Sequence, residues 1–199
     1  MKKVWIIAIP AVIACAAVIV SVLLLKSDMQ GAPVPFSAAW AHYVDGDELL
    51  DGGKYYASPQ AVRLEGTEGG NPYVVIHNFK RKISTVIYAP QQEYMEIEIA
   101  YDRLRHDFAQ FGTPCAPEAR KSHIGDDTLN GREVEKWICT YPNKKTEAVW
   151  YDIRLETAIR SDEGEDGCIQ LTNIKEGPQP ASLFVPPPGY TKFEARPSR

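Results

Sequence analysis

Histidine and glutamate are the residues of this 199-residue chain most suited to bind a metal or transfer a proton. The glutamates Glu93, Glu96 and Glu98 lie close together, but the alternation of polar and apolar residues places Glu96 and Glu98 on a solvated face. None of the four histidines has a second histidine, a cysteine or a carboxylate at a recognised ligand spacing; they are His42, His77, His106 and His123. We therefore expect neither a metal site nor a cofactor.

Sequence motifs of the common enzyme classes are also missing. The chain has no nucleophile elbow, no phosphate-binding loop and no Cys-x-x-Cys pair. Residues 27–199 carry 19 Lys and Arg against 26 Asp and Glu, a formal net charge of −7. A domain of this charge is not expected to bind nucleic acid. The sequence therefore predicts a protein that is not an enzyme and does not bind nucleic acid.

The N-terminal segment predicts export from the cytoplasm. Lys2 and Lys3 precede an uncharged apolar run of 22 residues, from Val4 to Leu25. A helix of this length spans about 30 Å, the thickness of the bilayer hydrocarbon core. A cleavable signal peptide usually has a shorter apolar core, so we favour an uncleaved anchor over a cleaved signal. The lysines before the run favour a cytoplasmic N-terminus, which predicts a single-pass protein of the inner (cytoplasmic) membrane with its domain in the periplasm.

Cys15 leaves another interpretation of the apolar run open. Val12-Ile13-Ala14-Cys15 resembles a loose lipobox, the site at which bacterial lipoproteins are acylated. A lipoprotein usually turns polar just after this cysteine, whereas this chain stays apolar as far as Leu25. We favour Cys15 as a small residue inside a membrane helix, with lipidation of Cys15 as the alternative.

The rest of the chain divides into a linker and one domain. Residues 1–26 form the anchor or signal segment, and residues 27–35 contain two prolines and no periodicity, as is typical of a linker. Residues 36–199 are long enough for a single domain with a sizeable core. Its short runs rich in Val, Ile, Tyr and Thr predict a mainly β fold built on an antiparallel sheet. The clearest runs are 36–44, 54–57, 62–66, 73–79, 82–88, 94–99, 132–141, 146–152, 155–161 and 168–174.

Two patterns indicate how this sheet is covered. Within 147–155 the alternate positions are apolar, which predicts one buried and one solvated face; these positions are Val149, Tyr151, Ile153 and Leu155. The proline-rich stretch 181–193 cannot be a central strand, so we expect it to pack along the outside.

Residues 101–111 have helical rather than strand periodicity. Four apolar side chains recur on one side of the expected helix, namely Tyr101, Leu104, Phe108 and Phe111. Gly112 and Pro114 end the pattern. A lone helix between two groups of strands is expected to lie over the open side of the sheet. The apolar stripe is either ordinary core or a surface that contacts a ligand.

Three cysteines follow the apolar run, which in an oxidising compartment suggests one disulfide and one free thiol. A bridge between Cys115 and Cys139 would tie the end of the predicted helix to a later strand. By the loop-entropy relation it would stabilise the fold by roughly 3 kcal/mol. Cys168 is geometrically a less suitable partner for Cys139. We favour the pair Cys115–Cys139, with three free thiols as the alternative.

Five segments, taken in order, resemble a family of bacterial exported proteins. They are GKYYASPQAVRLEG (53–66), VVIHNFKRKISTVIYAPQQEYMEI (74–97), LNGREVEKW (129–137), AVWYD (148–152) and LTNIKEGPQPASLFVPPPGYTKF (171–193). As a set they resemble the LolA/LolB-like superfamily of outer-membrane lipoprotein-sorting carriers, and most of all a branch whose function is unassigned. This resemblance implies an incomplete, strongly curved antiparallel β-barrel with a helical lid over a hydrophobic cavity.

The resemblance also implies that acyl chains or other apolar ligands bind inside the half-barrel. The chain differs from soluble carriers because it keeps a predicted membrane span. We therefore expect a membrane-tethered periplasmic binding module for a lipid, a lipoprotein acyl chain or another hydrophobic ligand. The alternative is an envelope structural or sensing domain that binds another envelope protein through its sheet and has no ligand cavity.

Overall fold

The computed structural model describes residues 34–44, 48–68, 70–98, 112–164 and 167–194. The chain divides into two units, residues 1–32 and 33–199, and all described residues belong to the second. The predicted anchor (residues 4–25), Cys15 and the predicted lid helix (residues 101–111) lie outside the described residues. Within the described ranges, no helix has the length and apolar character needed to cross a membrane.

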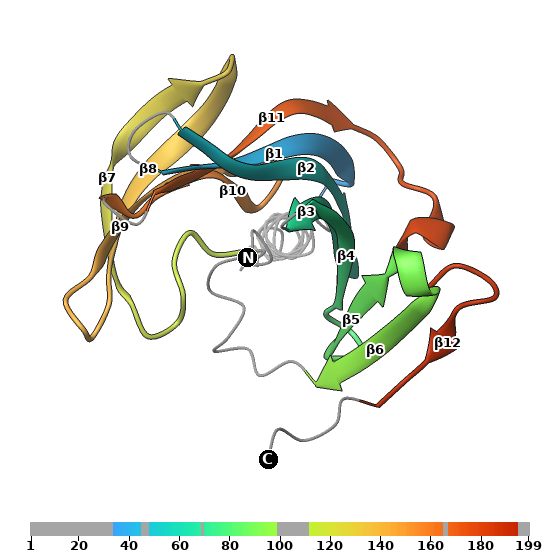
Figure 1. The fold of residues 1–199 in the computed structure, drawn as a ribbon. Coiled ribbons are helices and arrows are strands. Elements are labelled where there is room, and N and C mark those ends of the chain that lie inside the picture. The colour runs from blue at the N-terminus through green and yellow to red at the C-terminus, as the bar shows by residue number, and fades with distance from the viewer. Residues whose placement is uncertain (1–33, 45–47, 69, 99–111, 165–166, 195–199) are drawn as a thin grey trace, which may run out of the picture. The chain divides into compact units, whose positions relative to one another are not determined.

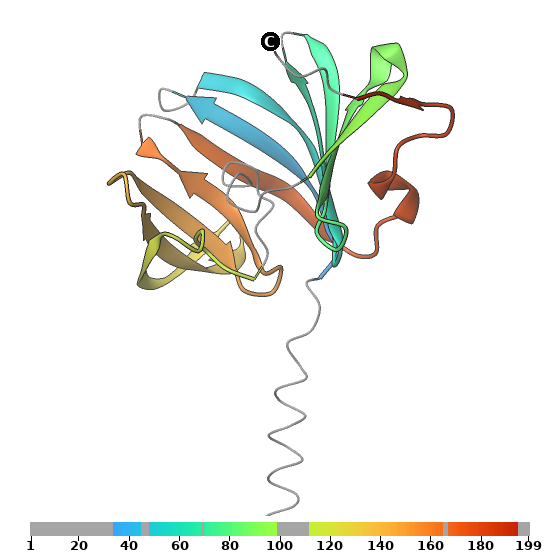
Figure 2. The ribbon, with the colours of Figure 1, turned by 90° about the horizontal axis from the view of Figure 1, so that it is seen from below.

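The described residues form a single open sheet of 12 strands, in the order β12-β6-β5-β4-β3-β2-β1-β11-β10-β9-β8-β7. Neighbouring strands are antiparallel except β12, which pairs in parallel with β6. The sheet curves strongly around a concave face (Figures 1 and 2), as predicted. The strands are β1 (Phe36–Val44), β2 (Glu48–Ser58), β3 (Ala61–Glu68), β4 (Asn71–Asn78), β5 (Ile83–Tyr88), β6 (Glu93–Glu98), β7 (Arg120–Leu129), β8 (Arg132–Thr140), β9 (Thr146–Asp152), β10 (Thr157–Asp162), β11 (Cys168–Glu176) and β12 (Thr191–Lys192). Two short 3-10 helices, η1 (Ala89–Gln91) and η4 (Ala181–Phe184), join them.

The C-terminal segment packs along the convex face of the sheet, as its prolines predict. Figure 1 shows η4 outside the curve of β3 and β4. Arg63 on β3 points to this side and donates a hydrogen bond from Nη1 to the carbonyl oxygen of Leu183, at 3.0 Å. Three apolar side chains of the convex face are also buried, namely Ala61, Ile76 and Ile87. Both faces of the sheet therefore bury apolar side chains in this half.

An ion pair anchors β12 to β6. Lys192 Nζ lies 3.0 Å from Glu96 Oε2, and Arg81 Nη2 lies 3.3 Å from Glu96 Oε1. The hydrogen bond from Lys192 and the two positive charges hold the pKa of Glu96 below its ordinary value of 4.5. A depressed carboxyl pKa stabilises the folded state above the unfolded pKa, and this stabilisation is lost as the pH falls through the lowered value.

We therefore expect acidification below about pH 4.5 to loosen β12 before the rest of the sheet. Hydrogen exchange of the Thr191 and Phe193 amides, which donate to Gln92 and Tyr94, measures this loosening once corrected for intrinsic rates. Replacing Glu96 with Gln should remove the pH dependence. An unchanged pH profile in Glu96→Gln would contradict this role.

The structure corrects the predicted alternation at the end of β9. Ile153 is 60% exposed, whereas Asp152, expected on the solvated face, is 2% exposed. β9 ends at Asp152, and a turn follows in which Asp152 Oδ1 accepts the backbone N–H groups of Arg154 and Leu155, at 2.9 and 3.0 Å. Its Oδ2 accepts a hydrogen bond from Arg132 Nε. Because the turn needs a buried carboxylate, the strand alternation stops at Asp152 and does not continue to Leu155.

Candidate functional site

Rows of apolar side chains cross the concave face of the sheet. Directly paired residues of neighbouring strands point to the same side. One row runs from β1 to β6 through Ala38, Tyr55, Leu64, Val75, Val86 and Met95. A second row runs through Phe36, Ala57, Val62, His77, Ser84 and Ile97. Apart from His77 and Ser84, every side chain in these rows is aliphatic, aromatic or a thioether. The concave face therefore offers a continuous apolar surface.

Burial of this surface decreases from the centre of the sheet towards β6. Phe36, Tyr55 and Val62 are completely buried, and the Phe36 and Tyr55 rings stack with centroids 5.6 Å apart. Met95 is half-buried, and Ile97 is 46% exposed. The accessible part of the apolar face is therefore its β5–β6 end.

Trp40 on β1 packs on the same face, next to Gly66 of β3. Its indole Nε1 donates to the carbonyl oxygen of Glu65 on β3, at 3.0 Å. A Cβ atom on Gly66 would lie 2.9 Å from Trp40 Cζ2. The indole therefore occupies space that a side chain would otherwise fill.

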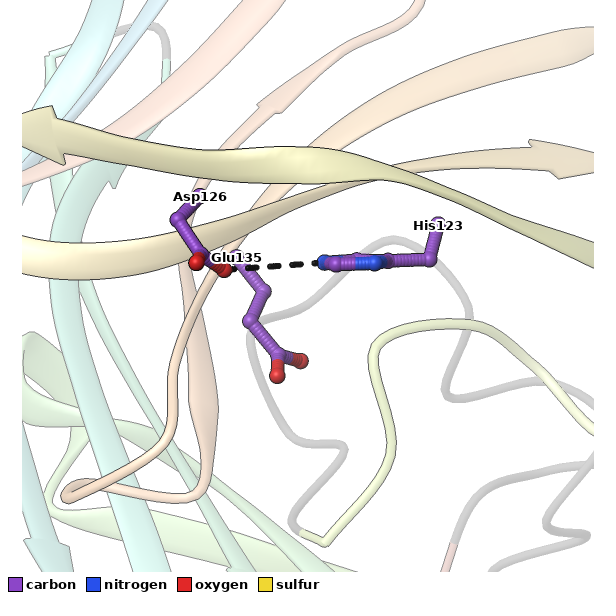
Figure 3. Close-up of side chains that lie close together, drawn as sticks. All are labelled: His123, Asp126 and Glu135. Carbon is purple, nitrogen blue, oxygen red and sulfur yellow. Dashed lines mark ion pairs between the residues drawn. The ribbon is translucent and has the colours of Figure 1, made fainter.

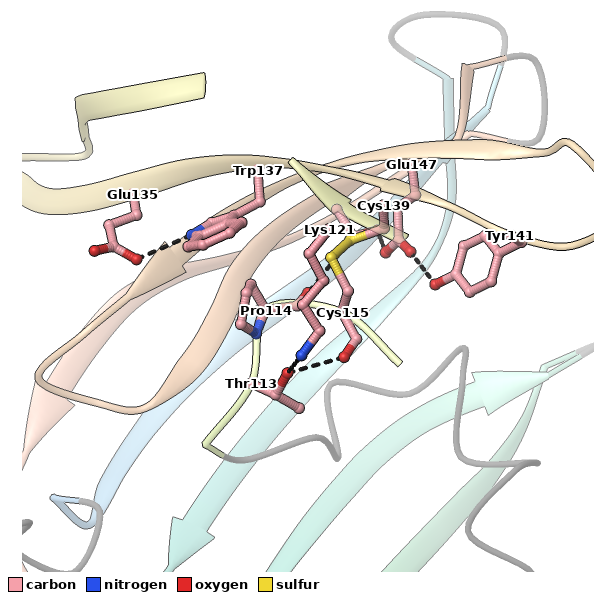
Figure 4. Close-up of a disulfide and its surroundings, with 10 residues drawn as sticks. Thr113, Pro114, Cys115, Lys121, Glu135, Trp137, Cys139, Tyr141 and Glu147 are labelled. Atoms are coloured by element: carbon pink, nitrogen blue, oxygen red, sulfur yellow. Dashed lines mark hydrogen bonds between the residues drawn. A yellow bond between two sulfur atoms is a disulfide. The ribbon is translucent and has the colours of Figure 1, made fainter. Parts of the chain in front are cut away.

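On the other half of the sheet, a disulfide fastens residues 112–119 to the concave face (Figure 4). Cys115 is bonded to Cys139 on β8, with Cα atoms 5.6 Å apart. Both cysteines are buried, in a cluster with Ala119, Val149 and Tyr151. The structure thus brings together the two cysteines that the sequence analysis favours as a pair, and it leaves Cys168 as a half-buried free thiol.

Glu147 is the carboxylate beside this disulfide, since it is paired with Cys139 across β8 and β9. Its two oxygens accept hydrogen bonds from the hydroxyl groups of Tyr141 and Ser161. Burial and the hydrogen bond to Glu147 raise the pKa of the Tyr141 phenol well above its ordinary value of 10. Tyr141 therefore stays protonated at physiological pH. The hydrogen bonds among Tyr141, Glu147 and Ser161 link neighbouring segments of the sheet rather than transfer protons.

A groove of about 640 Å³ lies at the β7–β8 end of the sheet. Its lining carries four carboxylates; the residues are Asp126, Asp127, Thr128, Glu133, Val134, Glu135 and Ile153. This groove is not the mainly apolar cavity that a lipid carrier needs, because four of the seven lining residues carry carboxylates.

The histidines remain mostly apart, as expected. His42 lies on β1 and His77 on β4, whereas His106 lies outside the described residues. His123 differs, because its Nε2 lies 3.8 Å from Asp126 Oδ1 and near Glu135. This grouping differs from the expectation that no histidine has a carboxylate at a ligand spacing. The signal that could have found it is Gly125 between His123 and Asp126, since a glycine inside a strand often marks a bulge.

The fold of this chain, an open and curved sheet, is similar to that of other proteins of known structure. No protein-family model and no curated protein sequence matches this chain. Solved structures do match it. An uncharacterised conserved protein from Thermus thermophilus aligns with a TM-score of 0.57 and 10% identity, over 87% of this chain and 98% of that protein.

Two larger proteins contain a similar sheet. MucB aligns with a TM-score of 0.53 and 13% identity over 85% of this chain. PNGF-II aligns with a TM-score of 0.53 and 11% identity over 81% of this chain. This chain spans 63% of the length of MucB and 31% of PNGF-II. MucB has been solved in complex with MucA of Pseudomonas aeruginosa. At these identities the likeness concerns the fold alone.

LolA-superfamily chains are also among the structural neighbours, as the sequence resemblance predicts. One is NE2245 from Nitrosomonas europaea, which aligns at 8% identity and a TM-score of 0.39, over 83% of this chain and 96% of that protein. This score is too low for individual residues or sites to be compared.

Proposed function

We propose that the domain of residues 36–199 binds an apolar ligand, a lipid or a lipoprotein acyl chain, against the concave face of its sheet. The observation that carries this proposal is the pair of apolar rows that cross six strands from β1 to β6. The apolar run of residues 4–25 would tether the domain to the inner membrane, with the domain in the periplasm. The protein would be a binding module rather than an enzyme.

Burial of the ligand supplies the binding energy in this proposal. Each methylene removed from water contributes about 0.8 kcal/mol. About ten buried methylenes would therefore contribute about 8 kcal/mol, before the loss of ligand freedom is subtracted. The accessible surface at Met95 and Ile97 is the place where such a chain would first make contact. We propose that the stripe of Tyr101, Leu104, Phe108 and Phe111 contacts the ligand from the opposite side.

A second candidate function is the binding of an envelope protein. Three observations favour it. The centre of the concave face is completely buried at Phe36, Tyr55 and Val62, which limits the depth available to a ligand. The described groove at β7–β8 is acidic rather than apolar. MucB, which shares the fold at a TM-score of 0.53, has a protein partner in MucA.

Site-specific photo-crosslinking in cells tests the proposal and separates the two candidates. Ile97 and Glu98 are neighbours on β6, both exposed, but Ile97 points to the concave face and Glu98 to the convex face. We expect a benzoylphenylalanine in place of Ile97 to form adducts with the mass of a lipid. The same probe in place of Glu98 is the matched control and should form none.

Other outcomes of this experiment would argue against a lipid on the concave face. Protein adducts at position 97 without lipid adducts would favour the second candidate. Equal adducts at positions 97 and 98, or none at either, would contradict binding to the concave face. Mass spectrometry of lipids that co-purify with the full-length chain then identifies the lipid class.

A further inference from the structure

Three potential metal ligands converge on β7 and β8. His123 and Asp126 lie on β7 and Glu135 on β8, and Figure 3 shows the side chains of His123 and Asp126 facing each other, with the Glu135 carboxylate beside them. One ligand atom from each residue lies within 4.8 Å of the other two. Of these, His123 Nε2 and Asp126 Oδ1 lie 3.8 Å apart. The set combines an imidazole nitrogen with two carboxylates and is not simply an acidic cluster.

A β-bulge brings His123 and Asp126 to the same face. Residues three apart in a regular strand point to opposite faces. In the β7–β8 pair, His123 is opposite Trp137 and Asp126 is opposite Glu135, with a register shift between His123 and Gly125. The extra residue is Ile124, which is 58% exposed. Bulges often redirect a side chain at functional positions, and here the bulge assembles the three ligands.

Trp137 orients two of the three ligands. Its ring lies against the His123 ring, with centroids 4.8 Å apart. Its indole Nε1 donates to Glu135 Oε2 at 2.9 Å, which leaves Glu135 Oε1 available. Metal-binding side chains are commonly held by such outer contacts, and loss of one typically weakens binding about 10- to 100-fold. The indole therefore has the position of an outer-shell partner.

The charges around the cluster also favour a cation. Asp127 and Glu133 line the same groove as Asp126 and Glu135. The basic side chains of β7 and β8 nearest in sequence are engaged elsewhere. Lys121 donates to Thr113 Oγ1, and Lys136 lies over the Trp150 ring at 4.6 Å. The local charge is therefore negative where the three ligand atoms meet.

We propose that His123, Asp126 and Glu135 bind a divalent transition-metal cation of the Zn²⁺ type. One imidazole and two carboxylates suit Zn²⁺ and its neighbours, whereas Ca²⁺ and Mg²⁺ prefer ligands that are all oxygen. Two ligands about 2.1 Å from a tetrahedral ion lie about 3.4 Å apart, so the side chains need to contract only slightly. Side chains of His123 and Asp126 are 43% and 91% exposed and free to do so. Three protein ligands leave a further position for water or for a side chain of a bound partner.

Calorimetric titration of the full-length, tag-free, EDTA-treated chain with ZnCl₂ tests this site. A Cys15→Ser/Cys168→Ser background removes both cysteines outside the disulfide as competing ligands. We expect one Zn²⁺ per chain, with no competition from MgCl₂ or CaCl₂. His123→Ala and Glu135→Gln should each weaken binding more than about 10-fold, and Trp137→Phe, which loses only the outer hydrogen bond, about 10-fold.

Glu133→Gln is the matched control. It removes one carboxylate from the same groove and the same strand but leaves the three ligands intact. Its Zn²⁺ affinity should fall only about twofold, because the exposed Glu133 adds to the local negative charge but is not one of the three ligands. The proposal is overturned if no stoichiometric Zn²⁺ binding occurs, if binding survives in His123→Ala, or if Glu133→Gln weakens it as much as Glu135→Gln. Circular dichroism checks that each variant is folded.

Discussion

Replacing Gly53 with alanine should severely destabilise the domain. Gly53 lies in the middle of β2, between β1 and β3. A Cβ atom there would clash severely with the carbonyl oxygen of Glu65 and lie 2.8 Å from its carbonyl carbon. Both are backbone atoms of β3, so relief requires the two strands to separate. The same oxygen accepts the hydrogen bond from Trp40, so the change would also displace that indole.

We expect this substitution to cost at least about 4 kcal/mol of unfolding free energy, in the range reserved for severe core changes. A typical domain has about 5–15 kcal/mol in total. Soluble yield, circular dichroism and urea unfolding followed by tryptophan fluorescence measure the effect.

Gly52→Ala is the graded comparison for this prediction. Its Cβ atom would lie 2.9 Å from the carbonyl oxygen of Trp40, a closer approach than real Cβ atoms show but a much milder one. It should reduce stability less than Gly53→Ala does. If the unfolding free energy of Gly53→Ala lies within about 1 kcal/mol of that of the unmodified chain, β2 and β3 are not as close as described at this position.

Removing the Cys115–Cys139 disulfide should lower the free energy of unfolding by about 3 kcal/mol. The bridge joins residues 24 apart in sequence, and without it the unfolded chain gains the freedom of that loop. In the folded state the bridge holds residues 112–119 against β8 and β9, beside Val149 and Tyr151. This part should therefore open first when the bridge is lost.

Urea unfolding with and without dithiothreitol, and of the double variant Cys115→Ala/Cys139→Ala, measures this contribution. Cys168→Ser is the control, since Cys168 forms no disulfide and its replacement should leave the effect of dithiothreitol unchanged. Equal stability in oxidised and reduced protein would show that the bridge contributes nothing. Proteolysis of the reduced protein, with cleavage sites mapped by mass spectrometry, shows whether residues 112–119 open first.

Strands are predicted best from the sequence where one face is buried. Phe36–Val44 and Thr146–Asp152 have the bounds expected from their alternation. Strand β7 (Arg120–Leu129) is different, because its sequence, RKSHIGDDTL, has no apolar alternation. β7 is an edge strand with one neighbour, and most of its residues are exposed. A polar edge strand has no hydrophobic alternation, so pairing with β8 rather than local pattern defines it.

The His123 cluster illustrates the same limit at the level of a site. Residues three apart in a regular strand point to opposite faces, so the spacing of His123 and Asp126 does not predict that they meet. Glu135 lies on another strand. The bulge at Ile124 and the β7–β8 register are tertiary features that no count of residues along the chain contains. The acidic groove beside it arises for the same reason.

Local rules are sufficient to predict the mainly β fold, the apolar alternation of most strands and the exclusion of the proline-rich stretch from the centre of the sheet. These rules are the two-residue period of a strand and the missing N–H group of proline. The alignment of apolar residues from six strands into rows needs the folded sheet, as does the burial of Asp152 beside an exposed Ile153. The meeting of His123, Asp126 and Glu135 needs it too. These features depend on register between strands distant in sequence, and register is set by the packing of the whole sheet.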